Sequence, residues 1–123
     1  MPTIFIVDDD PVIQRVLAYV LRKAGHTVIV ARNGFEALER LATTDVDLAI
    51  VDLAMPEMDG LTLIKKLRSD KRFKTLPLVM LTASGQDEDC VTARSVGVDA
   101  FLTKPTSSRE LTDVVSNLLE GAG

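Results

Sequence analysis

An apolar run that ends in a carboxylate constrains the fold of this chain more than any other feature. Residues 48–51 are uniformly apolar, and Asp52 follows them directly. Pro56 and Gly60 then turn the chain, and a helical pattern of apolar residues begins at Leu61. A continuous apolar run of this length is typical of a strand that is covered on both faces. The sequence therefore predicts a buried strand with Asp52 at its carboxyl end, where open α/β sheets bind their ligands.

Strands and helices alternate along the whole chain. Apolar runs predict strands at residues 3–7, 27–31, 48–51, 78–81 and 100–103. Helical spacing predicts helices between Pro11 and Gly25, at 35–42, at 61–67, at 87–96 and after Ser107. This alternation predicts a doubly wound, flavodoxin-like α/β fold with a five-stranded parallel sheet and helices on both sides. Among the common strand orders of such sheets, 2-1-3-4-5 suits five strands.

The predicted helices carry apolar faces, caps and one basic run. The first two helices are expected to bury stripes made of Val12, Ile13, Val16, Leu17, Val20 and Leu21, and of Phe35, Leu38, Leu41 and Ala42. Asn33 and Gly34 are interpreted as a turn, whereas Asp59 and Ser107 are expected to cap the third and last helices. The basic residues between 65 and 74 are Lys65, Lys66, Arg68, Lys71, Arg72 and Lys74. This run is typical of a solvated helix end, with a docking patch as the alternative.

Length and composition restrict the class of protein. The 123 residues favour a single domain spanning 1–123, and a hydrophobic content of 46% is enough for a core. The net charge of −4 argues against a nucleic-acid surface. The apolar run at 4–7 is too short for a signal peptide or a membrane span, so we expect no membrane insertion. Cys90 is the single cysteine, and a cytoplasmic location is therefore the simplest expectation.

Charged and polar side chains follow four of the predicted strands. Asp8 and Asp9 follow the first strand, Asp52 the third, Thr82 the fourth and Lys104 the fifth. In the strand order 2-1-3-4-5 these four strands are neighbours, so the five side chains are expected at one edge of the sheet. The carboxylates repel one another unless a proton or cation lies between them. All-oxygen ligands suit a hard divalent cation such as Mg²⁺.

The cation and the hydroxyl at this edge suit an anionic reactant. Lys104 can hold an anion or neutralise a carboxylate until an anion arrives, and Thr82 can donate a hydrogen bond to an anionic oxygen. A metal, a cation and a hydroxyl donor around a carboxylate are the requirements for phosphoryl transfer to that carboxylate. The residues alone leave open whether Asp52 or Asp8 is the acceptor.

Four groups of residues resemble a known family. They are Val7-Asp8-Asp9, Asp52 with Met55-Pro56 and Met58-Asp59-Gly60, Leu81-Thr82-Ala83, and Phe101-x-x-Lys104-Pro105. Together, in this order and at these strand ends, they resemble the receiver domain of bacterial two-component response regulators, of the chemotaxis-regulator type. The resemblance covers essentially the whole chain. One departure is Thr106, where the family often has phenylalanine, which affects local packing and not the chemistry.

The resemblance implies an acceptor and a metal site. Asp52 is expected to accept a phosphoryl group from the phosphohistidine of a histidine kinase or phosphotransfer protein. Asp9 and Asp52 are expected to bind Mg²⁺ directly, together with the backbone carbonyl of Ala54, while Asp8 acts through water. The chain is then a phosphoacceptor signalling domain and not an enzyme, with autophosphorylation and autodephosphorylation as its only intrinsic reactions.

The resemblance also implies a phosphorylation-dependent switch. Thr82 and the backbone amide of Ala83 are expected to contact the phosphoryl group, and Lys104 to pair with it. Thr82 and Phe101 are expected to move together and to change the face formed by the fourth helix, fifth strand and fifth helix. That face is expected to bind a downstream target protein or output domain, and phosphorylation-dependent dimerisation is left open. The Lys104–Pro105 bond is expected to be cis, with Pro105 in a structural role.

A phosphohydrolase of the haloacid-dehalogenase type is the main alternative. The pattern Asp8-x-Asp10-x-Val12 after the first strand fits that family, and its acceptor would be Asp8 instead of Asp52. No late acidic metal motif follows Lys104, however, and the chain looks short for that fold. Two further alternatives are a receiver-like binding module that has lost phosphorylation and a flavodoxin-type cofactor protein. The complete set of Asp8, Asp9, Asp52, Thr82 and Lys104 argues against the binding module. Three consecutive aspartates after the first strand would repel the phosphate of a flavodoxin-type cofactor.

Overall fold

The fold consists of one parallel sheet with helices on both faces. The computed structural model describes residues 2–55, 57–82 and 94–122. Its elements are β1 (Thr3–Val7), α1 (Pro11–Lys23), β2 (Thr27–Ala31), α2 (Gly34–Leu41), β3 (Leu48–Asp52), α3 (Gly60–Arg68), β4 (Leu78–Thr82), β5 (Ala100–Thr103) and α5 (Ser108–Ala122). Most of the helix predicted at 87–96 lies outside the described residues, although Arg94 and Ser95 are helical.

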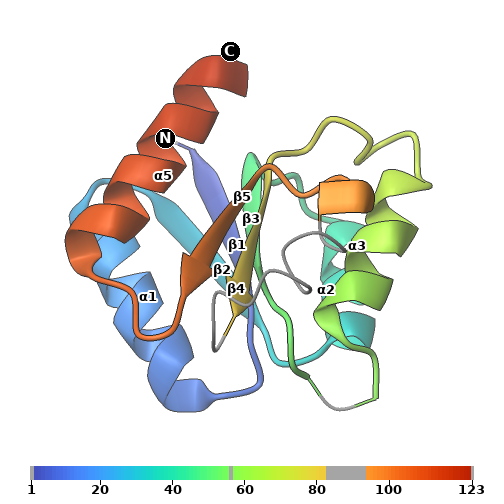
Figure 1. Cartoon of the computed structure of the whole chain (residues 1–123), viewed down its shortest axis with the longest axis horizontal. Coiled ribbons are helices and arrows are strands. Elements are labelled where there is room, and N and C mark those ends of the chain that lie inside the picture. The colour runs from blue at the N-terminus through green and yellow to red at the C-terminus, as the bar shows by residue number, and fades with distance from the viewer. Residues whose placement is uncertain (1, 56, 83–93, 123) are drawn as a thin grey trace.

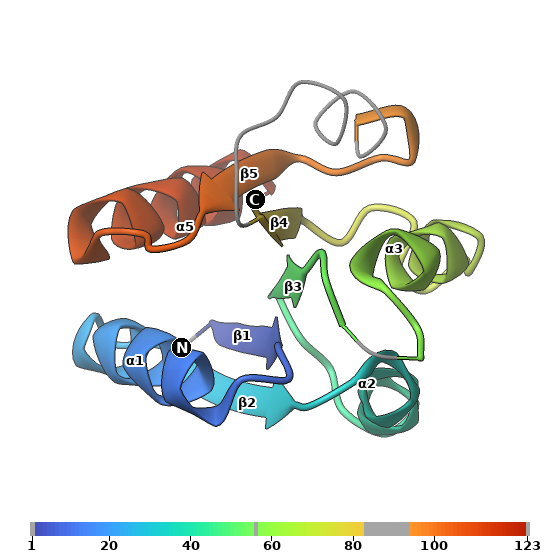
Figure 2. The same ribbon diagram turned by 60° about the horizontal axis from the view of Figure 1, so that its bottom comes forward.

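The strand order confirms the sequence prediction. The five strands pair in parallel in the order β2-β1-β3-β4-β5. The central strands β3 and β4 are buried along their full length, as their continuous apolar sequences require. In Figures 1 and 2, α1 and α5 cover one face of the sheet, and α2 and α3 cover the other. No helix in the described part of the chain is long and apolar enough to span a membrane.

Two apolar clusters fill the spaces between the sheet and its helices. One cluster joins Phe5 and Met80 to side chains of α2 and α3, such as Leu41 and Leu63. The other joins alternate residues of the same strands to α1 and α5. Since neighbouring strand residues point to opposite faces, each central strand contributes to both clusters. The sheet is thereby held from both sides, and its carboxyl edge remains accessible.

Four helices are capped at their N-termini by a side-chain oxygen that accepts a hydrogen bond from a backbone N–H. The pairs are Asp10 with Val12 (2.9 Å), Asn33 with Glu36 (2.8 Å), Asp59 with Thr62 (2.8 Å) and Ser107 with Glu110 (3.0 Å). The predicted caps at Asp59 and Ser107 are confirmed. Asn33, interpreted from the sequence as a turn residue, is instead the cap of α2.

The predicted apolar faces of α1 and α2 are partly wrong. Val12 and Val16 are 58% and 56% exposed, and Phe35 is 55% exposed. The buried residues of α1 are Gln14, Leu17, Ala18 and Leu21. The apolar residues of α1 cover more than one face of the helix, and the sheet contacts the side that carries the small Ala18. Periodicity therefore located the helix but did not determine which side of it is buried.

Arg68 corrects the interpretation of the basic run as a solvated helix end. Its guanidinium donates to the carbonyls of Gly97 (2.9 Å), Phe73 (2.8 Å), Lys74 (3.3 Å) and Leu76 (2.7 Å), and to Asp99 Oδ2 at 3.0 Å. The same Asp99 oxygen accepts the N–H of Leu78 at 2.8 Å. Arg68 therefore joins the end of α3 to the segments that lead into β4 and β5. Lys65, Lys66, Lys71, Arg72 and Lys74 are exposed, as predicted.

Candidate functional site

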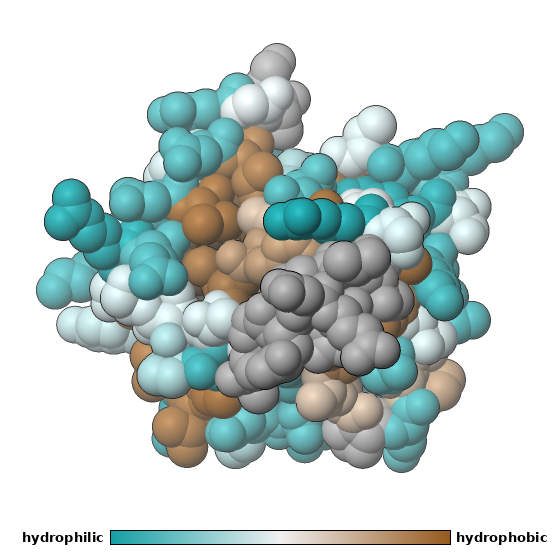
Figure 3. All heavy atoms as spheres, in the orientation of Figure 1, coloured by the Kyte–Doolittle hydropathy of each residue, from teal (hydrophilic) through white to brown (hydrophobic). Residues whose placement is uncertain are grey.

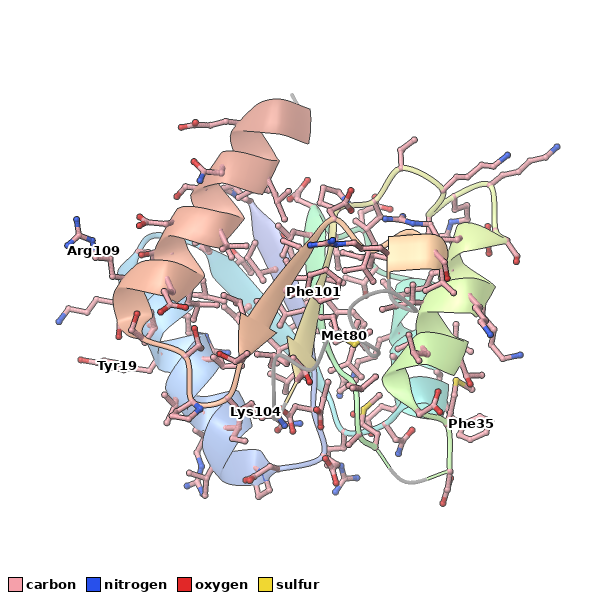
Figure 4. The ribbon with its side chains drawn as sticks, viewed as in Figure 1. Tyr19, Phe35, Met80, Phe101, Lys104 and Arg109 are labelled. Atoms are coloured by element: carbon pink, nitrogen blue, oxygen red, sulfur yellow. The ribbon has the colours of Figure 1, made fainter. Side chains whose placement is uncertain are left out.

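The carboxyl edge of the sheet brings together the side chains that the sequence placed at strand ends. Strand β3 ends with Asp52 and β4 with Thr82, while Asp8 and Asp9 follow β1 directly. The register pairs Asp52 with Leu81 and Thr82 with Thr103, so β3, β4 and β5 end at nearly the same level. In Figure 4, Lys104 lies just beyond the tips of β4 and β5.

Three carboxylates form a compact cluster at this edge. One oxygen from each of Asp8, Asp9 and Asp52 lies within 4.8 Å of the other two. Asp8 is fully buried and Asp52 is 2% exposed, whereas Asp9 is exposed. The cluster therefore has a buried floor made by two carboxylates and an open side where Asp9 meets solvent. Among the described residues, the side of the cluster formed by Asp9 is therefore open to a cation or a reactant.

Lys104 is the cation that partly neutralises this cluster. Its Nζ lies 2.9 Å from Asp52 Oδ1 and 3.4 Å from Asp8 Oδ2. Burial acts to lower the pKa of Lys104, but the hydrogen bond with Asp52 and the charges of both carboxylates raise it above its ordinary value. The ammonium therefore remains charged at neutral pH and can pair with a new anion at this edge.

The pKa of Asp52 is raised in spite of Lys104. Burial is the largest cause, and the negative charge of Asp8 acts in the same direction. The hydrogen bond and the charge of Lys104, and a 3.3 Å hydrogen bond from the Ala54 N–H, lower the pKa but do not compensate. Three carboxylates in the cluster face one ammonium, and burial disfavours the charged form of Asp52 further.

The donor set fits a hard divalent metal ion. Asp8 Oδ1 accepts the N–H of Asp10 at 2.9 Å, but the buried Oδ2 has no hydrogen-bond partner among the described residues and only the ion pair with Lys104. A buried carboxylate oxygen of this kind is costly unless a cation lies near it. Asp9 and Asp52 add further oxygens, and carboxylate oxygens are the ligands that Mg²⁺ prefers. The residues present therefore fit a bound divalent cation.

Gln14 and Gly60 support the site through contacts that the sequence did not indicate. The Gln14 side chain donates to the carbonyl of Asp8 and, at 3.1 Å, to the carbonyl of Ala31, which joins the ends of β1 and β2. Gly60 lies so close to β3 that a Cβ there would be 2.3 Å from the carbonyl oxygen of Asp52. The polar residue within an apolar stripe was a signal for Gln14. For Gly60, the sequence indicated a turn but not this contact.

The remaining predicted residues lie on β4, on β5 and in the loop that follows. Thr82 is 2% exposed at the end of β4, and Phe101 is half-buried on β5 opposite Met80. The Arg94 guanidinium lies 5.5 Å from the centre of the Phe101 ring. The Lys104–Pro105 bond is cis, as expected. Ala83, predicted to donate its amide, lies outside the described residues.

The fold and this cluster define a class of protein. The family model described as response regulator receiver domain matches residues 4–116. The chain therefore belongs to the response regulator receiver domains of two-component signalling systems, whose family role is to accept a phosphoryl group. The match excludes the phosphohydrolase and flavodoxin alternatives as families for this chain.

The relatives differ in how much of their own length this chain covers. Chemotaxis protein CheY1 of Helicobacter pylori is 37% identical over 118 residues, which cover 94% of this chain and 95% of that protein. The transcriptional regulatory protein PhoP of Bacillus subtilis is 38% identical, over 94% of this chain but 48% of its own length. The structure of chemotaxis protein CheY4 of Vibrio cholerae aligns with a TM-score of 0.92 at 30% identity, covering 96% of this chain and 98% of that one. The chain is therefore a CheY-like receiver domain by sequence and by fold.

Proposed function

We propose that Asp52 is the phosphoacceptor of this receiver domain. The main support is the geometry at the carboxyl edge, where Lys104 Nζ lies 2.9 Å from Asp52 Oδ1 and two further carboxylates lie within 4.8 Å. Asp52 is at the centre of this arrangement because it contacts both Lys104 and, through Oδ1, the N–H of Ala54. Asp8 is also buried, and its Oδ2 lies farther from Lys104 Nζ, at 3.4 Å.

The reaction forms one bond and breaks one bond. A carboxylate oxygen of Asp52 attacks the phosphorus of a phosphohistidine on a histidine kinase or phosphotransfer protein, and the P–N bond to the imidazole breaks. The product is an aspartyl phosphate, and the electron pair of the broken bond goes to the imidazole. Lys104 leaves its position on Asp52 and pairs with a phosphoryl oxygen, which keeps the negative charge of the product neutralised.

Mg²⁺ is the proposed metal ion at the carboxylate cluster. Asp9, Asp52 and the backbone carbonyl of Ala54 are its proposed direct ligands, and Asp8 acts through water. When bound, Mg²⁺ supplies positive charge that stabilises the phosphoryl oxygens during transfer. Asp9 is exposed and Asp8 is buried, which supports direct coordination by Asp9 and contact through water by Asp8. The exposed carboxylate of Asp9 can reach an ion on the open side of the cluster.

The switch is proposed to link this edge to one face of the molecule. Thr82 and the Ala83 amide contact the phosphoryl group, and Phe101 changes position with Thr82. The readout face consists of the fourth helix, β5 and α5. Figure 3 supports a binding role for that face, since hydrophobic residues gather between α5 and β5. Partly buried Ala100, Val114 and Leu118 belong to these two elements.

The proposal extends to the domain organisation, location and partners of the chain. The chain acts as a single receiver domain spanning residues 1–123, without direct nucleic-acid contact, and located in the cytoplasm. Its partners are a histidine kinase or phosphotransfer protein and a downstream target protein or output domain. Its own catalytic contribution is limited to phosphorylation from small phosphodonors and loss of its own phosphoryl group.

Intact-mass labelling with acetyl phosphate and Mg²⁺ tests the acceptor. The wild type is expected to gain one hydroxylamine-labile phosphoryl group, and Asp52→Asn or chelation of the metal is expected to abolish the gain. Asp59→Asn is the matched control, because the amide oxygen of asparagine can keep the cap on α3 while a carboxylate outside the cluster is removed. Continued labelling of Asp52→Asn, with loss of label in Asp8→Asn, would contradict the proposal.

A further inference from the structure

Two grooves away from the carboxylate cluster share one basic surface. The first groove lies between α1 and β2, and the second between α1 and the first turns of α5. Tyr19 and Lys23 line both grooves, Arg15 and Arg22 line the first, and Arg109 lines the second. Figure 4 shows Tyr19 and Arg109 pointing outward on the same side of the molecule. We call these five residues the basic face.

The charge of the basic face is opposite to that of the whole chain. The chain contains 18 acidic and 14 basic residues, yet no aspartate or glutamate lines either groove. Helix α1 and strand β2 contain none in their sequences, whereas α5 contains Glu110, Asp113 and Glu120, which do not line the second groove. Within residues 2–55, 57–82 and 94–122, none of the four cations of the face forms an ion pair with a carboxylate. The face therefore presents concentrated positive charge to an approaching partner.

A favourable interaction with a helix dipole accounts for only some of the four cations of the basic face. Arg22 and Lys23 occupy the last turn of α1, where cations interact favourably with the helix dipole. Arg109 instead occupies the first turn of α5, where the dipole disfavours a cation. Arg15 lies in the second turn of α1, away from the favourable end. Half of the cations therefore occupy positions that the helices themselves do not favour.

The basic face also offers apolar contacts. Tyr19 is 65% exposed, and Lys23 Nζ lies 5.8 Å from the centre of its ring. Ala18 and Val30 line the first groove, and Val20 lines the second. The grooves have volumes of about 570 and 470 Å³, which can hold several side chains of a partner. Exposed tyrosine and arginine together are typical of protein-binding surfaces.

We propose that the basic face binds an acidic, partly apolar segment of another protein. The four cations attract the carboxylates of the segment, and Tyr19 with the apolar groove residues holds its hydrophobic side chains. A nucleic acid fits less well, because the chain is acidic overall and the cations are divided between two grooves with apolar lining. Neither groove is lined by a member of the carboxylate cluster or by Lys104. Gln14 also lines the first groove and hydrogen-bonds the carbonyls of Asp8 and Ala31, so a bound segment would lie beside a support of the carboxyl edge without covering its carboxylates.

The test uses a short synthetic peptide in which glutamates alternate with leucines and a companion peptide with glutamine at each glutamate. Backbone amide signals of the ¹⁵N-labelled protein are followed during titration. The acidic peptide is expected to shift signals of α1, β2 and the start of α5, and the glutamine peptide to bind about tenfold more weakly or worse. Equal affinity for both peptides would overturn the proposal.

Charge-reversal variants give a matched comparison. The triple variant Arg22→Glu, Lys23→Glu, Arg109→Glu is expected to bind the acidic peptide at least about tenfold more weakly. Lys65→Glu, Lys66→Glu, Lys71→Glu changes the net charge equally on α3 and its following loop and is expected to leave the affinity within about twofold. Equal losses in both variants would mean that net charge alone attracts the peptide and would overturn the proposal. The corresponding glutamine variants, checked by thermal unfolding, provide the comparison if a glutamate variant does not fold.

Further measurements separate this proposal from the acceptor chemistry and distinguish a protein segment from other ligands of the basic face. Labelling of the Arg22, Lys23, Arg109 variant by acetyl phosphate is expected to match the wild type, so a failure of the proposed acceptor chemistry would be recognised separately. A DNA duplex or anionic lipid vesicles that shift the same signals at equal affinity would overturn the choice of a protein segment. Concentration-dependent sedimentation that requires the same three cations would overturn it in favour of a second copy of this chain.

Discussion

At the scale of single residues, burial and charge oppose each other at Asp52. It is 2% exposed, it lies in a cluster with two other carboxylates, and its pKa is raised, with burial as the largest cause. A group whose pKa is higher in the folded state binds protons more tightly there than in the unfolded chain. Its contribution to the free energy of unfolding therefore becomes less favourable as the pH rises through that pKa.

Asp52→Asn is accordingly expected to increase the free energy of unfolding at pH 7 in metal-free buffer. The amide removes a buried negative charge, and Lys104 keeps Asp8 as its ionic partner. This gain in the free energy of unfolding should be absent below pH 3.8, the ordinary pKa of an aspartate, because the carboxyl is then neutral in the folded and the unfolded state. The gain should appear as the pH rises above that value. Urea denaturation across this pH range measures it. A variant that is less stable than the wild type at pH 7 would contradict the assignment of the raised pKa.

At the scale of elements, the start of α3 controls the position of β3. Gly60 is the first residue of α3, its N–H donates to the carbonyl of Leu53 at 2.9 Å, and Asp59 caps the helix. An added Cβ would approach the backbone oxygen of Asp52 to 2.3 Å. Because the obstacle is backbone and not a flexible side chain, the strand end or the helix must move.

Gly60→Ala is therefore expected to lower the free energy of unfolding by about 1–3 kcal/mol, the usual cost of overpacking. It should also slow labelling by acetyl phosphate, since Asp52 shifts with its backbone. Gly121→Ala is the matched control, because nothing lies within 4 Å of its added Cβ. That variant should be neutral or more stable by up to about 1 kcal/mol. Similar effects of the two substitutions would mean that the contact with β3 does not constrain the site.

Arg68 has the corresponding role at the opposite end of α3. Its side chain is 17% exposed and donates to four carbonyls and to Asp99. Arg68→Ala is expected to lower the free energy of unfolding by about 2–4 kcal/mol, because several acceptors lose a charged donor at once. Arg40→Ala removes an exposed ion pair with Glu36 at 3.6 Å and should cost about 0.3–0.5 kcal/mol. Chemical denaturation of both variants measures the difference, and equal costs would show that the Arg68 contacts contribute little.

At the scale of the whole molecule, the core and the functional edge are separate parts of one sheet. Two apolar clusters hold the sheet from both faces, while unfavourable charge is concentrated where the strands end. The stability that the core provides allows three carboxylates to lie within 4.8 Å of one another. A divalent cation that binds only the folded state should therefore stabilise the entire molecule.

Mg²⁺ is expected to raise the free energy of unfolding by about 2.7 kcal/mol when its free concentration is a hundred times its dissociation constant. Asp9→Asn and Asp52→Asn should lose most of this increase, whereas Asp59→Asn should keep it. Thermal unfolding with Mg²⁺ and with a chelator measures the effect. An equal increase in all three variants would place the ion outside the carboxylate cluster.

The elements of the fold and most of the candidate site were accessible from the sequence. The strands predicted at 3–7, 27–31 and 100–103 match the observed bounds, and those at 48–51 and 78–81 each extend by one residue. Five candidate side chains were predicted to meet because parallel strands end at one edge of a sheet. The structure brings Asp8, Asp9, Asp52 and Lys104 together and places Thr82 at the same edge, at the end of β4. Gln14 and Arg68 were missed because their partners are backbone carbonyls of other segments, which no local pattern reveals.

The sequence alone therefore determined the order and type of the elements and the chemistry at the sheet edge. The type of each element follows from local periodicity, and the meeting of the strand ends follows from the rule that parallel strands end at one edge of a sheet. Only the tertiary structure decided which side of α1 is buried, how Lys104 divides its charge between Asp52 and Asp8, and which cations form the basic face. Those features depend on how helices pack against the sheet, and packing is set by contacts between residues that are distant in the sequence.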